Sequence, residues 1–292
     1  ARGGVRATGG AGRAAGGRVQ YVGPGGHDLI PDIETREKGG TPGILQTLRA
    51  AMAFEIKAAI GVDEIERREQ AMTRQALSRW GVHPRIEILG NTDPERRIAI
   101  ISFNVREPQG RYLHPRFVTT LLDDLFGIQS RAGCSCAGPY GHRLLGIDED
   151  RSEAYRAWIH KGFSGIKPGW CRIGFHYVFD EPEVQFVLDA VEFVADHGHR
   201  FLPLYRFDPH SGVWQHRSAN KQRVVFSIDE ALGDRPRVDA KTEPLSADVR
   251  SKYYRTCLRE AHEYRQRLPD SEGGQAESSD SYFGDVGFFR LT

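Results

Sequence analysis

The sequence is poor in cysteine and has no long apolar run. Four cysteines in 292 residues are too few for a disulfide-stapled scaffold of this size. No apolar run approaches the roughly 20 residues of a membrane-spanning helix, and no short apolar segment near the start is typical of a secretory signal. These absences argue against a membrane protein and against secretion. They favour a reducing compartment, either cytoplasmic or organellar.

The sequence also lacks an excess of charge of either sign. Forty basic and 39 acidic residues give a formal net charge of +1, so there is no general reason to expect nucleic acid or an anionic membrane as a partner. A hydrophobic content of 39% is enough for a real core. The length favours about two domains, and the chain contains no internal repeat.

The first 18 residues contain no acidic residue and no serine, and are almost entirely Ala, Gly and Arg. We expect this segment to be disordered. A transit peptide is usually rich in serine, so we interpret the chain as the remainder of something longer rather than as a chain with a transit peptide.

The next residues predict a strand and two helices. Residues 19–33 are typical of a short strand followed by a Gly/Pro turn. Thr41 is a good N-cap and Pro42 suits the first helical position. Apolar residues then recur at helical spacing, at Ile44, Leu48, Met52, Ile56 and Ile60. Gly61 interrupts this helix, and a charge-rich helix follows as far as Trp80.

The middle of the chain alternates strands and helices. Strands are expected over residues 85–89, 97–105, 128–130 and 171–178, with the second central because it is nearly all apolar. In the last of these, Ile173, Phe175 and Tyr177 alternate with Arg172, Gly174 and His176. Helices are expected from Pro115, around Tyr155 and after Asp180. This order favours an α+β layer in which helices cover a small, largely antiparallel sheet.

The pattern loosens beyond His197. Residues 224–228 suggest a strand and residues 246–267 a charged helix. Residues 269–281 are Ser, Glu, Gly and Asp, a composition that buries too little apolar surface to stay ordered.

The segment RAGCSCAGPYGH, residues 131–142, combines thiols with glycine and proline, and we expect a loop there. Cys136 in such a loop suits a nucleophile whose thiolate Arg131 and Arg143 would favour; the alternative is a small buried residue. Cys134, Cys136 and His142 suggest a zinc or dithiol site, but a structural zinc needs four ligands and usually a wider cysteine spacing. We therefore expect no metal.

Two further positions suit anions. The planar fork of Arg131 matches a carboxylate, although a surface arginine often pairs with any nearby acid. Gly40 and Thr41 in GGTP read as a helix cap, and the same geometry leaves backbone N–H groups free for a phosphate. His114, His142 and His176 are each more typical of structural histidines than of catalysts.

These two loops together resemble the class V aminotransferase superfamily, in particular its cysteine desulfurase-like branch of pyridoxal phosphate (PLP) enzymes. REKGGTP precedes a long helix, and Arg131, Gly133, Cys136, Ala137 and Pro139 match the pattern Arg-x-Gly-x-x-Cys-Ala-x-Pro. The resemblance covers roughly residues 16–197. It implies the α/β fold class of PLP-dependent transferases of fold type I, as the end of the large domain plus the C-terminal α+β small domain.

The resemblance also implies roles for single residues. Thr41, with Gly40, would hold the phosphate of pyridoxal 5'-phosphate, commonly in the neighbouring subunit of a homodimer. Arg131 would hold the carboxylate of the amino-acid substrate. Cys136 would take sulfur from cysteine as a persulfide and leave alanine.

The sequence departs from the family in three places. One is the segment from about His199 to Thr292, which exceeds the usual small domain and carries no motif. Cys134 and Ser135 stand where the family loop usually has two histidines, so transaminase, lyase or epimerase chemistry stays open. The family's Schiff-base lysine precedes the segment that aligns with residues 19–33, but this chain has no lysine before Lys38. We therefore expect the C-terminal portion of a PLP enzyme, or alternatively a cofactor-free interaction module with the same fold.

The expected division of the chain follows from these assignments. It has five parts: a disordered start (1–18), the end of the PLP-binding large domain with the long linking helix (19–60), the small domain with the cysteine loop (61–197), a C-terminal extension (198–268) and a mostly disordered tail (269–292).

Overall fold

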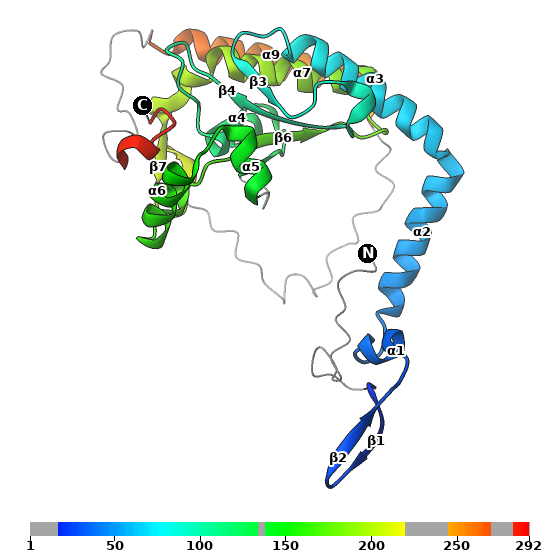
Figure 1. Cartoon of the computed structure of the whole chain (residues 1–292). Helices are drawn as coiled ribbons and strands as arrows, with labels where there is room; N and C mark the ends of the chain where they lie inside the picture. Colours follow the sequence, from blue (N-terminus) through cyan, green and yellow to red (C-terminus); the bar gives the residue numbers. More distant parts are fainter. Residues whose placement is uncertain (1–16, 134–137, 220–244, 270–282, 292) are drawn as a thin grey trace, which may run out of the picture. The chain divides into compact units, whose positions relative to one another are not determined.

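The computed structural model describes residues 17–133, 138–219, 245–269 and 283–291. The chain separates into two compact units, residues 1–64 and residues 65–292 (Figure 1). No helix of the described residues is long and apolar enough to cross a membrane.

The first unit contains a β-hairpin followed by helices. Strands β1 (Val19–Gly23) and β2 (Gly26–Leu29) pair antiparallel, where the sequence had suggested one strand and a turn. The short α1 (Ile33–Glu37) and the long α2 (Ile44–Ile60) follow. The expected start of α2 was wrong: its N-cap is Gly43, not Thr41. Gly43 keeps a non-helical ψ of 84°, consistent with the low helix propensity of glycine.

The second unit is built on a four-stranded antiparallel sheet, within the described residues, in the order β3-β4-β6-β5. The strands are β3 (Ile86–Leu89), β4 (Ile100–Val105), β5 (Arg131–Gly133) and β6 (Trp170–Gly174). The predicted antiparallel sheet and the interior position of the second strand are confirmed. Three strand predictions were wrong in their bounds. The short strand lies at 131–133 rather than 128–130, and β4 begins at Ile100 rather than at residue 97. The last strand ends at Gly174 because its final pair is with Ile100, the first residue of β4.

Helices cover the apolar face of this sheet. They are α3 (Val62–Trp80), α4 (Pro115–Phe126) and α7 (Glu181–His197). Trp80 is fully buried, with its ring centroid 5.5 Å from Phe103 and 5.9 Å from Phe175. The predicted stripe of α4 is buried, and Gly127 ends that helix in the left-handed conformation at φ 66°. The core therefore lies between the sheet and these helices.

The predicted loop over residues 131–142 was wrong in part. Residues 131–133 form β5, and Gly138–Leu145 form helix α5. Proline is compatible with the first turn of a helix, so Pro139 does not prevent a helix there. Helix α6 (Glu149–His160) follows, with Asp148 as its N-cap.

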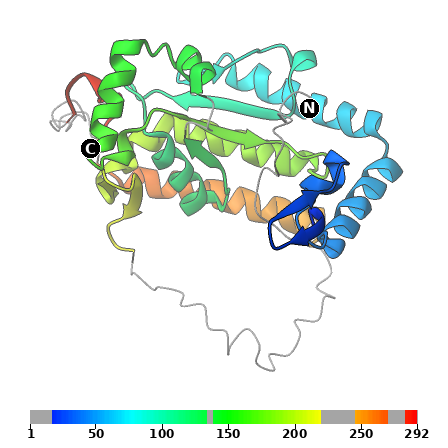
Figure 2. The same ribbon diagram turned by 60° about the horizontal axis from the view of Figure 1, so that its bottom comes forward.

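The C-terminal extension packs on the same unit. Strands β7 (Tyr205–Asp208) and β8 (Val213–His216) form a hairpin. The predicted charged helix is confirmed as α9 (Ala247–Arg267), capped by Ser246, and it runs beside α7 (Figure 2). The ring of Tyr254 on α9 stacks on Phe186 of α7, with centroids 4.4 Å apart. The suggested strand at 224–228 lies outside the described residues.

The expectation of a mostly disordered tail did not foresee the packing of residues 283–291. Phe289 is fully buried, with its ring centroid 4.5 Å from that of His114. The Arg290 side chain, itself buried, lies 3.3 Å from the carboxylate of buried Glu107. Long-range burial holds this segment, and its composition alone did not indicate that.

Candidate functional site

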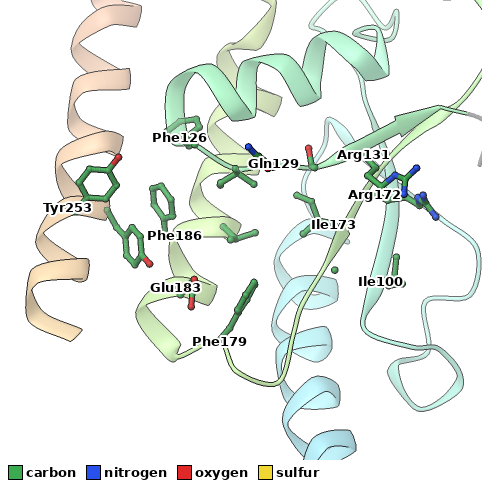
Figure 3. A pocket seen from close by; sticks show the side chains of 16 residues that line it. Ile100, Phe126, Gln129, Arg131, Arg172, Ile173, Phe179, Glu183, Phe186 and Tyr253 are labelled. Atoms are coloured by element: carbon green, nitrogen blue, oxygen red, sulfur yellow. The ribbon is translucent and has the colours of Figure 1, made fainter. Parts of the chain in front are cut away.

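Arg131, the predicted carboxylate-binding residue, lies on β5 at the edge of the sheet. Its direct cross-strand partner is Arg172 of β6, so two guanidinium groups stand side by side (Figure 3). Like charges directly opposite each other destabilise a sheet. Within the described residues, neither side chain makes a hydrogen bond or ion pair with the protein. The pair is therefore an arrangement suited to an anionic ligand.

Two glycines lie at and opposite the end of β5. Gly133 has φ of 127°, a conformation that side chains rarely allow. A Cβ atom on Gly169 would lie only 2.5 Å from the carbonyl carbon of Gly133. Glycine at 169 therefore allows the close approach of the two backbones, and glycine at 133 allows the backbone angle. Cys136, the predicted nucleophile, and Cys134 lie outside the described residues, in the segment that follows.

Gly40 and Thr41, the predicted phosphate-binding residues, lie in the first unit and are exposed. Gly40 has a φ of 81°, and α2 begins three residues after Thr41 without a side-chain hydrogen bond to cap it. The uncapped N–H groups of α2 are compatible with an anion. Gly40 and Thr41 belong to the first unit and Arg131 to the second.

The histidines have structural partners. His142 bonds the carbonyl oxygen of Gly138 at 3.0 Å and the hydroxyl of Ser152 at 2.8 Å, so it ties α5 to α6. His114 is buried between the carbonyl of Gly165 and the backbone N–H of Arg116, and burial lowers its pKa to about 4. These contacts support the structural interpretation of both residues.

Cys171 and Lys38, a second cysteine and the first lysine of the chain, have ordinary structural roles. Cys171 is fully buried and donates to the carbonyl of Pro115, and burial raises the pKa of its thiol. Lys38 is exposed and pairs with Glu34 at 3.2 Å. The described residues contain no group of three or more His, Cys, Asp or Glu arranged to hold a metal ion.

A cavity of about 680 Å³ lies beside Arg131 and Arg172. Its walls come from the end of α4, from β6, and from the N-terminal halves of α7 and α9. Figure 3 shows Phe126, Phe186 and Tyr253 on one side of it and Ile173 on the other. The arginine pair thus lies at the rim of a pocket with one aromatic wall.

Sequence patterns alone did not identify Arg172 as a site residue. The sequence shows that Arg172 belongs to an alternating strand pattern over residues 171–177. It does not show the strand register that places Arg172 opposite Arg131. Only the pairing of β5 with β6 brings the two residues together.

Comparison with known sequences identifies the family. The model of the class V aminotransferase family (Aminotransferase class-V) matches residues 14–187, and the chain belongs to this family. Membership gives it the α/β fold class of PLP-dependent transferases of fold type I, in agreement with the mixed helices and strands described above.

Curated relatives match a shorter part of the chain. A protein of Halalkalibacterium halodurans described as a probable cysteine desulfurase is 34% identical over 108 residues, which is 37% of this chain and 24% of that protein. A protein of Streptomyces coelicolor with the same description is 35% identical over 102 residues, 35% of this chain and 23% of that protein. The chain spans about a quarter of the length of these relatives.

A solved structure is also similar. The apo structure of a cysteine desulfurase from Thermococcus onnurineus NA1 matches 62% of this chain and 38% of its own, with 27% identity and a TM-score of 0.46.

Proposed function

We propose that these residues form the C-terminal portion of a PLP-dependent enzyme that acts on an amino acid, and that its reaction is cysteine desulfuration. The observation that supports this most directly is the pairing of Arg131, at the start of the strand that precedes Cys136, with Arg172 of the neighbouring strand. An unpaired double guanidinium suits an amino-acid carboxylate, and a thiol a few residues along the chain suits attack on a nearby sulfur atom.

The residues present suit pyridoxal phosphate in part. Helix α2 begins without a side-chain cap, shortly after Gly40 with its positive φ, and such a start is compatible with a phosphate. Gly40 and Thr41 would hold the phosphate group of the cofactor. The family resemblance implies that this happens within a homodimer. Residues 1–37 contain no lysine, and Lys38 pairs with Glu34, so the lysine that anchors the cofactor is expected from outside these residues. When bound, the cofactor supplies an electron sink for bond cleavage in the amino acid.

The chain's own residues would then have separate tasks. Arg131 and Arg172 hold the substrate carboxylate and so orient the side chain of cysteine. The thiolate of Cys136 takes the sulfur atom of that side chain. One carbon–sulfur bond breaks, one sulfur–sulfur bond forms, and alanine leaves while the enzyme keeps a persulfide. The number of electrons balances without an added oxidant. A thiolate in this role suits a reducing compartment.

The first test is for the cofactor. We expect the protein isolated from its source to gain the mass of one PLP per chain after borohydride reduction, since reduction fixes a Schiff base covalently. A mass of 32.8 kDa with no adduct would instead favour the alternative of a cofactor-free interaction module.

The second test separates the reactions. With Cys136→Ser, sulfide release from cysteine should disappear while PLP binding persists. An unchanged rate of sulfide release would refute desulfuration and favour transaminase, lyase or epimerase chemistry. Arg172→Gln should raise the KM for cysteine about tenfold or more, the cost of one charged hydrogen-bond partner. Arg156→Gln, in an exposed pair with Glu153, is the matched control and should leave KM unchanged.

A further inference from the structure

The cavity beside the arginine pair has a wall that the C-terminal extension provides. Tyr253 and Tyr254 of α9 line it, opposite Ile173 of β6. An ion pair between Arg250 and Asp180 ties the start of α9 to the start of α7, and Tyr254 stacks on Phe186 with 14° between the ring planes. The extension therefore holds two aromatic residues at a fixed place in the pocket.

One carboxylate lies in this aromatic surface. Glu183, in the first turn of α7, lines the cavity (Figure 3). Its carboxylate accepts from the backbone N–H of Asp180 and is attracted by Arg250. Burial, and after it the neighbouring Asp180, nevertheless raise the pKa of Glu183. A partly desolvated carboxylate is better stabilised by a further cation than by water alone.

The carboxylates at the start of α7 outnumber the cation beside them. Arg250 attracts the charges of both Asp180 and Glu183, but its guanidinium bonds the carboxylate of Asp180 and the carbonyl of Leu245. The charge of Asp180 is thus balanced by a direct ion pair, and that of Glu183 is not. Arg131 and Arg172 lie at the far rim, and in Figure 3 their guanidinium groups point away from the aromatic wall.

We propose that this cavity binds an organic cation, an amine carried on an aromatic or branched apolar body, with its ammonium group at Glu183. The apolar body has Phe126, Phe186 and Ile173 to contact, and the exposed ring of Tyr253 offers a π-face for the positive charge. A cavity of about 680 Å³ is of the size that small-molecule sites have. This inference goes beyond the amino-acid chemistry proposed above and does not depend on it.

The test measures binding of three probes of nearly equal shape to the 292-residue chain by calorimetry, with no PLP present. The probes are 2-phenylethylamine (cationic), 2-phenylethanol (neutral) and phenylacetate (anionic). We expect the amine to bind about tenfold more tightly than the alcohol, the gain from one ion pair with a cation–π contact. Equal binding of amine and alcohol, or a preference for phenylacetate, would overturn the proposal.

Variants locate the site. Glu183→Gln should abolish the preference for the amine and leave the alcohol unaffected. Glu181→Gln is the matched control, because Glu181 lies in the same helical turn but bonds Gln75 and Gln185; it should keep the preference. Tyr253→Ala should weaken amine binding several-fold, whereas Tyr140→Ala, another exposed tyrosine, should not. Retention of the amine preference in Glu183→Gln would refute the assignment.

Discussion

The two units differ in how their apolar residues are used. Helix α2 of the first unit has 17 residues and none of them is buried. Its large apolar side chains are exposed, including Leu45, Met52 and Phe54. In the second unit the large apolar side chains fill a core, and Trp80, Phe103 and Leu121 have no exposed surface.

The comparison shows that helix formation and helix burial are separate properties of this sequence. Alanine, leucine and methionine favour the helical backbone of α2 wherever it lies. Most of the stability of a protein helix nevertheless comes from packing of its apolar face, and in the described residues α2 has no such packing. A helix with apolar residues on several faces is typical of a buried element, so α2 carries the pattern of a core helix.

The largest expected effect contrasts two phenylalanines. Phe103→Ala in the core should lower the free energy of unfolding by about 3–5 kcal/mol, from lost burial and the cavity left behind. Phe54→Ala in α2, where the side chain is 73% exposed, should change it by less than about 0.5 kcal/mol. Urea unfolding followed by circular dichroism measures both.

A large loss of unfolding free energy in Phe54→Ala would contradict this contrast between the units, because it would mean that another surface covers α2 in solution. Repeating the measurement at two protein concentrations would then tell whether the cover is a second copy, since only intermolecular burial depends on concentration.

A smaller effect concerns the space around two glycines. Gly169→Ala should destabilise the second unit by about 1–3 kcal/mol, as expected for an overpacked site, because the new methyl group would clash with the backbone of Gly133. Gly25→Ala in the hairpin of the first unit meets no atom within 4 Å and should be tolerated. The thermal unfolding temperatures of the two variants test this. Equal shifts would contradict the expected difference in packing.

The smallest effect is the pH dependence caused by His114. Its pKa is lowered to about 4 in the folded state, from an ordinary value of 6.5, chiefly by burial. The unfolded chain therefore binds a proton that the folded state excludes, and stability falls as the pH drops below 6.5 and levels off below about 4. The expected loss is about 0.7 kcal/mol from pH 7 to pH 6 and about 2 kcal/mol by pH 5.

Urea unfolding of the wild type and of His114→Asn across this pH range measures the contribution. Asparagine keeps a side-chain acceptor for the N-terminus of α4 but does not titrate, so its stability should depend less on pH. An identical pH dependence in both proteins would exclude His114 as the source.

Elements with strong local signals were predictable. Helix α4 has Pro115 at its start, an apolar stripe and Gly127 at its end, and its bounds follow from these residues. Helix α5 was missed because Gly138 and Pro139 are equally typical of a loop and of a helix start. The tail was missed because the partners of Phe289 include His114, far away in the sequence.

The residues of the candidate site were predictable from the sequence only where they belong to a recognisable motif. Arg131 and Gly133 belong to the segment that resembles the family loop, and the sequence indicated both. Arg172 and Gly169 lie more than 30 residues further along, and their importance depends on the register between β5 and β6. Strand register depends on the whole sheet and on its buried face, so local patterns could not identify them.

The contact between Glu107 and Arg290 has a consequence for how the chain is made. The two residues are 183 positions apart, and synthesis at about 5–20 residues per second separates their appearance by on the order of 10–40 s. During that interval the Glu107 carboxylate has only its local backbone donors at Gln109 and Arg111, and the place of Phe289 beside His114 is empty. The nascent sheet domain therefore remains open at this corner until residues 283–291 have been made.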